Sequence, residues 1–199
     1  VRDEPRVALD KMTKGVHSVL DAAGVSESRV LGLGVAVPSP VDRERPGELL
    51  PLIVPAWEGI NIATHLRDKF DRPVFVDNDA NLGALAELWW GAGSAVKDLA
   101  YIKVATGIGA GLIIDGSIFR GSAGVAGEMG HTSIDPNGPQ CVCGLKGCLA
   151  TLIGTPALLD RAKEALAESG SNRPAPTDID ELVDAALEGD PASKELIYY

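Results

Sequence analysis

Hydrophobic residues recur at helical spacing near the start of the chain. Between residues 7 and 23 the apolar side chains follow roughly the 3.6-residue period of an α-helix, and Gly24 is a typical residue for ending one. A shorter helix is predicted over residues 61–70, where Ile62 and Leu66 lie one turn apart. The first part of the chain is therefore expected to contain two amphipathic helices.

Two continuous apolar runs lie between and after these helices. Residues 30–37 and 74–77 each predict a strand that is buried on both faces. The second run leads through the polar residues 78–81 into a predicted helix over residues 82–90. A strand that feeds a helix through polar residues is typical of α/β proteins, in which ligands collect at the carboxyl ends of the strands.

The second half of the chain is richer in glycine and turn residues. A glycine-rich turn is expected over residues 105–111, a hairpin turn at Asp115-Gly116 and an irregular loop over residues 121–130. The predicted strands lie at residues 99–104, 112–114 and 117–119. Helices are predicted from the N-cap Thr155 to residue 168 and over residues 178–188, with a loop over residues 170–176.

Composition narrows the class of protein. The chain has 199 residues, 45% of them hydrophobic, which is enough for one sizeable core or two modest ones. Its formal net charge is −10 and it has no run of Lys and Arg, so these residues show no electrostatic footprint for nucleic acid. No apolar run approaches the roughly 20 residues of a membrane span.

The ends of the sequence indicate part of a longer protein. It begins at Val1 rather than Met, and a helical pattern continues to the last residue. The first residues lack an apolar signal region, and with reduced cysteines this predicts a cytoplasmic protein.

All three cysteines, Cys141, Cys143 and Cys148, fall within eight residues. With His131 they make the kind of closed tetrahedral ligand set that zinc prefers. The alternatives are reduced core cysteines, or one disulfide and a free thiol. Core cysteines scatter at strand or helix spacing, whereas these lie in a turn-rich stretch, so the pattern favours a metal.

Three further places contain candidate chemistry. Asp79 follows a predicted strand and suits a general base or a ligand acceptor, although Asp79 or Asn81 would equally serve as the N-cap of the next helix. The turn at Thr106-Gly107 can present backbone N–H groups to a phosphate, or can simply be a tight hairpin. Glu128 precedes His131 by three residues, and it can accept from a sugar hydroxyl or be solvated beside a structural metal site.

Together these motifs resemble the ROK family, which groups transcriptional repressors and sugar kinases on an actin-like ATPase (ribonuclease H-like) α/β fold of two lobes. The resemblance is carried by residues 32–42, 76–81, 104–112, 126–131 and 138–149, and by Gly121. It implies an N-terminal lobe that includes residues 1–80 and a C-terminal lobe that includes residues 81–199, both incomplete here.

The resemblance also implies roles for individual residues. Asn78, Asp79, Glu128 and His131 match sugar-binding positions, and in a kinase Asp79 would deprotonate the sugar hydroxyl. Thr106 and Gly107 match the turn that contacts nucleotide phosphate. His131, Cys141, Cys143 and Cys148 match the ligands of a structural Zn²⁺.

The chain also departs from the kinase pattern. Ala105 stands where kinases of the family have the first glycine of the phosphate turn, and Ala150 where they have a sugar-contacting glutamate. Ser39 replaces the usual glycine between Pro38 and Pro40. These 199 residues contain neither the Asp-x-Gly-Gly-Thr phosphate loop of active kinases nor a winged helix-turn-helix.

Three functions fit these observations. The departures and residues 82–93 favour the sugar-sensing effector domain of a transcriptional regulator, which would reach DNA through a domain outside this chain. The alternative is an ATP-dependent sugar kinase that phosphorylates a hexose or N-acetyl-hexosamine and uses Mg-ATP. The third is a zinc module in a non-catalytic scaffold. The family analogy further implies a homo-oligomer, and the lack of a long apolar run predicts no membrane partner.

Overall fold

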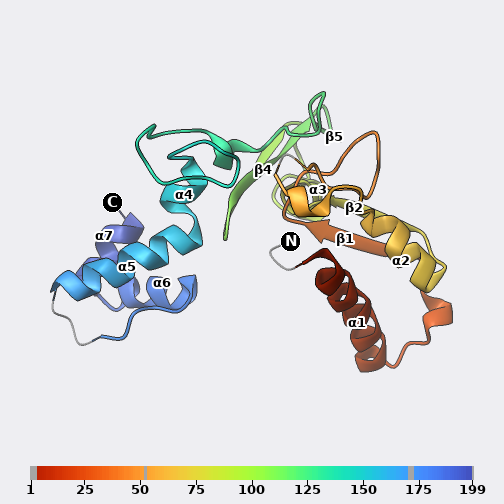
Figure 1. Ribbon diagram of the computed structural model, residues 1–199, viewed down its shortest axis with the longest axis horizontal. Coiled ribbons are helices and arrows are strands. Elements are labelled where there is room, and N and C mark those ends of the chain that lie inside the picture. Colours follow the sequence, from red (N-terminus) through yellow and green to blue (C-terminus); the bar gives the residue numbers. More distant parts are fainter. Residues whose placement is uncertain (1–3, 52, 170–172, 199) are drawn as a thin grey trace. The chain divides into compact units, whose positions relative to one another are not determined.

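The computed structural model describes residues 4–51, 53–169 and 173–198 (Figure 1). It is a mixed α/β structure that divides into two compact units. Unit 1 comprises Val1–Tyr101 and Ala110–Gly127, and unit 2 comprises Ile102–Gly109 and Glu128–Tyr199. The expected boundary between residues 80 and 81 lies inside unit 1, and the assignment of those two segments to the lobes of a whole protein remains a prediction.

Unit 1 begins with the predicted helices and strands. Its α-helices and strands before the unit boundary are α1 (Pro5–Ala23), β1 (Leu33–Val37), α2 (Ile62–Phe70), β2 (Val74–Asn78) and α3 (Asp79–Trp90), with 3₁₀ turns at Glu27–Arg29 and Pro55–Trp57. Gly24 ends α1 with φ 62°, and Asn61 caps α2 by accepting from Thr64 N at 2.8 Å. β1 and β2 pair in parallel, which sets Val37 opposite Asn78 at their carboxyl ends.

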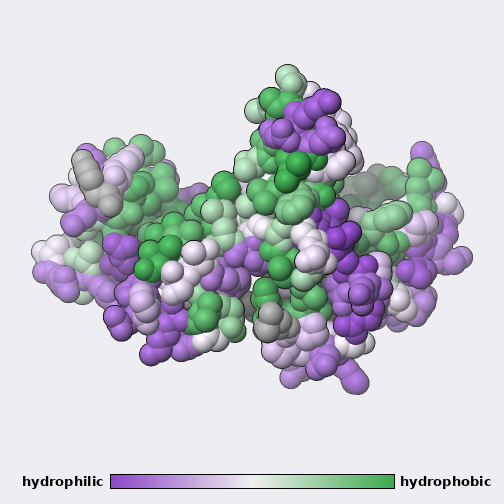
Figure 2. Space-filling model, turned by 90° about the horizontal axis from the view of Figure 1, so that it is seen from above, coloured by the Kyte–Doolittle hydropathy of each residue, from purple (hydrophilic) through white to green (hydrophobic). Residues whose placement is uncertain are grey.

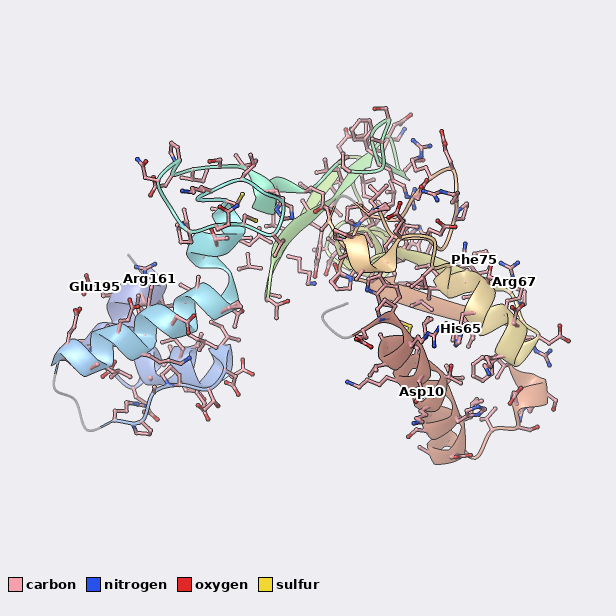
Figure 3. All side chains as sticks on the ribbon, viewed as in Figure 1. Asp10, His65, Arg67, Phe75, Arg161 and Glu195 are labelled. Atoms are coloured by element: carbon pink, nitrogen blue, oxygen red, sulfur yellow. The ribbon has the colours of Figure 1, made fainter. Side chains whose placement is uncertain are left out.

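The core of unit 1 lies where α1 and α2 meet one face of the β1–β2 pair. Trp57, Ile62 and Leu66 are almost completely buried there. Val37 of β1 and Val74 of β2 pack with them. His65 of α2 faces α1, where its Nε2 lies 3.4 Å from the hydroxyl of Thr13 (Figure 3). These contacts bury one stripe of each helix.

The expectation that both strands are buried on both faces is wrong for the described chain. Burial alternates along β1, and Leu31 and Phe75 are 92% and 73% exposed. Continuous apolar sequence buries a strand on both faces only if both faces are covered, and α1 and α2 cover one. Hydrophobic residues accordingly reach the surface beside hydrophilic ones (Figure 2).

A three-stranded sheet has the order β3-β4-β5, with β3 at Leu99–Val104, β4 at Ile108–Ile114 and β5 at Ser117–Ile118. The predicted hairpin is confirmed, because Asp115 and Gly116 both have positive φ and Ile114 pairs with Ser117. The glycine-rich turn is shorter than predicted. It ends at Gly107, and the remaining glycines belong to β4.

Unit 2 continues with a 3₁₀ turn at Met129–His131 and four helices. These are α4 (Leu149–Ile153), α5 (Thr155–Ser169), α6 (Ile179–Leu187) and α7 (Pro191–Tyr198). Asp178, expected as the first residue of its helix, is instead the N-cap of α6 and accepts from Glu181 N at 2.9 Å, whereas the predicted N-cap Thr155 is the first residue of α5 itself. The five-residue α4 was not predicted, since it is too short to show a period.

Residues 170–172 of the expected loop lie outside the described residues, and residues 173–176 have no helix or strand. Among the helices described, none is long and apolar enough to cross a membrane.

Candidate functional site

The three cysteines and His131 converge in unit 2. Their four candidate ligand atoms all lie within 4.8 Å of one another. The Sγ of Cys141 is 3.4 Å from Nδ1 of His131, and the Sγ atoms of Cys143 and Cys148 are 3.6 Å apart. The edges of a tetrahedral zinc site with sulfur and nitrogen ligands are about 3.5–3.8 Å. The cluster therefore has the size and the donor atoms to hold a metal ion.

Tight turns bring the cysteines together. Cys141 N donates to Leu145 O at 2.8 Å, and Gly144 has φ 91° between them. Gly147 allows a close approach, because a Cβ on it would lie 1.7 Å from Asp135 O. Only glycine fits there, and the next residue, Cys148, is completely buried at the start of α4.

The environment of the cluster keeps the bare thiol of Cys148 protonated. Burial, reinforced by hydrogen bonds with the other two thiols, raises the pKa of Cys148 to about 12. Burial also lowers the pKa of His131, which favours the neutral imidazole that a metal requires. A divalent cation would reverse the preference at Cys148, since it stabilises the thiolate directly.

Glu128 lies against the other side of His131. The Nε2 atom of His131 is 3.8 Å from Oε2 of Glu128, and both side chains are about a quarter exposed (23% each). Nδ1 thus faces the cysteines while Nε2 faces a carboxylate at the surface. The predicted pair of Glu128 and His131 is brought together within unit 2.

Asn78 and Asp79 lie at the carboxyl end of β2, in unit 1. Asn78 is the N-cap of α3, because its Oδ1 accepts from Ala80 N at 2.9 Å and from Asn81 N at 3.2 Å. The alternative that Asp79 or Asn81 caps this helix is therefore wrong. Asp79 is the first helical residue and is half-buried.

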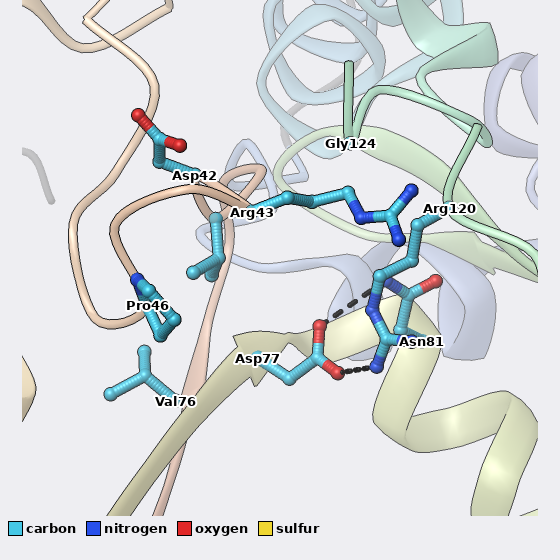
Figure 4. A pocket seen from close by; sticks show the side chains of 9 residues that line it. Asp42, Arg43, Pro46, Val76, Asp77, Asn81, Arg120 and Gly124 are labelled. Carbon is cyan, nitrogen blue, oxygen red and sulfur yellow. Dashed lines mark hydrogen bonds and ion pairs between the residues drawn. The ribbon is translucent and has the colours of Figure 1, made fainter. Parts of the chain in front are cut away.

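Asp77 lies at the centre of a network that sequence reasoning missed (Figure 4). Its Oδ1 accepts from Asn78 N at 2.8 Å and from Asn81 Nδ2 at 3.3 Å, and its Oδ2 accepts from Nη2 of Arg120. Arg43 donates to Gly121 O at 2.7 Å. The network borders a cavity of about 260 Å³.

Thr106 and Gly107 form the turn between β3 and β4 in unit 2. Ala105 N donates to Gly107 O at 2.9 Å, and Thr155 N donates to Ala105 O at 2.9 Å, so the turn lies at the start of α5. A Cβ on Gly107 would meet nothing within 4 Å. The backbone here is open to an approaching group, as the phosphate hypothesis requires.

Comparisons with known proteins agree with these features. The sequence model of the ROK family matches residues 3–199 of this chain. Over 168 residues the chain is 39% identical to a xylose repressor of Caldicellulosiruptor bescii, covering 84% of this chain and 41% of that protein. It is 35% identical over 162 residues to a glucokinase of Halalkalibacterium halodurans, covering 81% of this chain and 47% of that protein. The chain thus spans less than half the length of either relative.

A solved structure is similar over almost the whole chain. The ROK family glucokinase of Streptomyces griseus, in complex with glucose and AMPPNP, superposes with a TM-score of 0.83 at 27% identity, covering 97% of this chain and 63% of that one. The expected actin-like ATPase fold is thereby confirmed. With its sequence matched from residue 3 to residue 199, the chain belongs to the ROK family.

Proposed function

We propose that this chain is the sugar-sensing effector region of a ROK transcriptional regulator, with the DNA-binding domain outside these 199 residues. The observation that carries the proposal is a contrast among the candidate residues. Asn78, Asp79, Glu128 and His131 are all present, whereas Ala105 adds a methyl group at the phosphate turn and Ala150 offers no side-chain hydrogen bond. The similarity to xylose repressors supports the same choice.

The proposed sugar contacts follow from the donors and acceptors in each unit. In unit 1 the cap uses Oδ1 of Asn78 and leaves Nδ2 of the same amide as a donor for a sugar hydroxyl. Asp79 beside it supplies carboxylate acceptors. In unit 2 Glu128 accepts hydroxyl protons, and Nε2 of His131 is the second partner. A sugar can regulate a DNA-binding domain if it binds one arrangement of the protein more tightly than another, because binding then shifts the equilibrium between them.

We propose Zn²⁺ as the metal of the cluster in unit 2. His131 would bind it through Nδ1, and Cys141, Cys143 and Cys148 through sulfur. Three thiolates and one imidazole complete a tetrahedron, so the ion supplies a structural anchor and has no open position for catalysis. Nε2 of His131 would then face Glu128, and a carboxylate partner of this kind usually orients a metal-binding histidine.

The alternative is an ATP-dependent sugar kinase. The similarity to the Streptomyces griseus glucokinase with bound glucose and AMPPNP favours it. Asp79 would then accept the proton of the attacking hydroxyl, and Thr106 and Gly107 would contact the phosphates of Mg-ATP. The third possibility, a zinc module without a ligand, needs only the cysteine cluster.

Sugar binding by the full-length protein tests the proposal. Calorimetry with xylose, hexoses and N-acetyl-hexosamines should find a ligand, and Asp79→Ala should weaken its binding by roughly 10-fold or more, because a carboxylate acceptor is lost. Asp68→Ala, on the exposed side of α2, is the matched control and should bind normally. Release of operator DNA by the same sugar would support the regulator.

Two outcomes would decide against it. Formation of a sugar phosphate from ATP would favour the kinase. A folded protein that binds none of these sugars would leave only the zinc module. A homo-oligomer is proposed on family analogy and a cytoplasmic location from the reduced cysteines, and light scattering of the full-length protein would measure the assembly state.

A further inference from the structure

The side chain of Arg120 joins two segments that are distant in sequence. It extends from the second residue after β5 to the carboxyl end of β2, where its guanidinium binds the carboxylate of Asp77 (Figure 4). The side chains of Arg120 and Asp77 are 37% and 19% exposed. A guanidinium–carboxylate pair of this kind is charge-assisted and directional, so it constrains the orientation of Asp77.

Asp77 in turn constrains the residues that follow it. Its Oδ1 receives the backbone N–H of Asn78 and the side-chain amide of Asn81. Asn78 then caps α3 through its own Oδ1. The bonds therefore form a continuous chain from Arg120 through Asp77 to the turn that carries Asn78 and Asp79.

Asn81 shows how closely this turn is enclosed. It is 5% exposed, and among the described residues its Oδ1 has no hydrogen-bond partner. The hydrogen bond from Nδ2 to Asp77 is therefore the described side-chain contact that holds this buried amide. Loss of the Arg120–Asp77 pair would loosen both Asn78 and Asn81.

We infer that Arg120 is a positioning residue for the sugar site. It acts through Asp77, which it holds in the rotamer that orients Asn78 and Asp79 toward the ligand. The inference rests on the proposed sugar-binding function and adds a residue that does not itself contact the sugar. Nothing local in the sequence around Arg120 indicates this role.

The test compares Arg120→Ala with Arg67→Ala, an exposed arginine of α2, in the full-length protein. Arg120→Ala should weaken sugar binding by about 10-fold, whereas Arg67→Ala should leave it unchanged. Since Arg120 lines the cavity of about 260 Å³, its removal leaves room for a free guanidinium ion. Guanidinium chloride at low millimolar concentration should restore binding, and sodium chloride at the same ionic strength should not.

Two further measurements separate positioning from general stability. If Arg120 acts through Asp77, the effects of Arg120→Ala and Asp77→Asn on sugar affinity should be strongly non-additive. Hydrogen exchange should show faster exchange at residues 78–81 in Arg120→Ala, with α1 and α2 unchanged. This readout needs no sugar, so it distinguishes a failure of the inference from a failure of the proposed function.

Either of two results would overturn the inference. One is normal sugar affinity and normal exchange at residues 78–81 in a folded Arg120→Ala protein. The other is weakened binding that guanidinium does not restore and that adds fully to the effect of Asp77→Asn.

Discussion

At the scale of single residues, Cys148 combines complete burial with a proposed role as metal ligand. It is 0% exposed, and its sulfur lies 3.6 Å from that of Cys143. Serine at this position keeps the shape but removes the thiolate that zinc requires. The residue therefore allows a direct test of the metal proposal.

We expect Cys148→Ser to reduce zinc from about one ion per chain to well below half and to lower the thermal midpoint, because metal binding contributes folding energy. Metal analysis and a thermal melt measure the two effects. The control is Val142→Ser, which should keep its zinc, because Val142 lies between two of the cysteines but its side chain is 82% exposed. A fully loaded Cys148→Ser protein would contradict the assignment of this ligand.

Some residues of the candidate sites can be recognised from the local sequence, and others cannot. The cysteine spacing and the polar run after β2 were visible in the sequence. Arg120 and Asp77 are 43 residues apart, and no local pattern predicts that they meet. The predicted N-cap of α3, Asp79 or Asn81, was wrong as well, because several polar residues in a row can each cap a helix and only backbone geometry selects one.

At the scale of elements, the contact of α3 with β4 depends on Gly111. A Cβ on this residue would lie 2.2 Å from Ala80 O and 2.6 Å from the Cβ of Ala84. Neither neighbour is the end of a flexible side chain, so the elements themselves would have to separate. Gly111 was predicted to belong to the glycine-rich turn, but it lies in β4. The close packing of α3 explains why a glycine is needed at this position.

Gly111→Ala should therefore destabilise unit 1 by roughly 1–3 kcal/mol through overpacking. Gly34→Ala is the control, because Gly34 also lies in a strand and a Cβ there meets nothing within 4 Å. Urea unfolding curves of both variants measure the difference. Equal stability of the two would show that α3 and β4 can separate without cost.

Asp190 stabilises the start of α7. Its Oδ2 accepts from both the backbone N–H and the hydroxyl of Ser193, at 2.8 and 2.7 Å. These hydrogen bonds hold the pKa of Asp190 below its ordinary value. Because the folded state prefers the ionised form, this stabilisation is present above the ordinary carboxyl pKa of about 3.9 and is lost as the pH falls below it.

Asp190→Ala should cost about 1 kcal/mol of helix stability at neutral pH, as is usual for loss of an N-cap. The difference from the wild-type protein should shrink as the pH falls below about 4. Asp190→Asn retains a capping oxygen without a titrating group and is the control. Circular dichroism melts across this pH range follow the effect, and a pH-independent difference would rule out ionisation as its source.

At the scale of the whole molecule, the two units divide the proposed chemistry. All four proposed metal ligands belong to unit 2, whereas Asn78, Asp79 and the Asp77 network belong to unit 1. Metal loss should therefore act first on unit 2. The internal structure of unit 1 depends on its own core around Trp57 and Ile62.

Treatment with a zinc chelator should accelerate hydrogen exchange in residues 131–154 while β1, β2 and α2 keep their protection. Mass spectrometry of the exchanged protein resolves these segments, and re-addition of zinc should reverse the change. Simultaneous loss of protection in unit 1 would show that the metal stabilises more than its own unit.

The sequence by itself determined most helices, the hairpin at Asp115-Gly116, the family and the metal-ligand candidates. These depend on short-range properties: periodicity, turn chemistry and the spacing of ligands. Only the tertiary structure decided which strand faces are covered, that β4 begins at Ile108, and that Arg120 reaches Asp77. Those features depend on contacts between segments far apart in the chain, which local patterns do not encode.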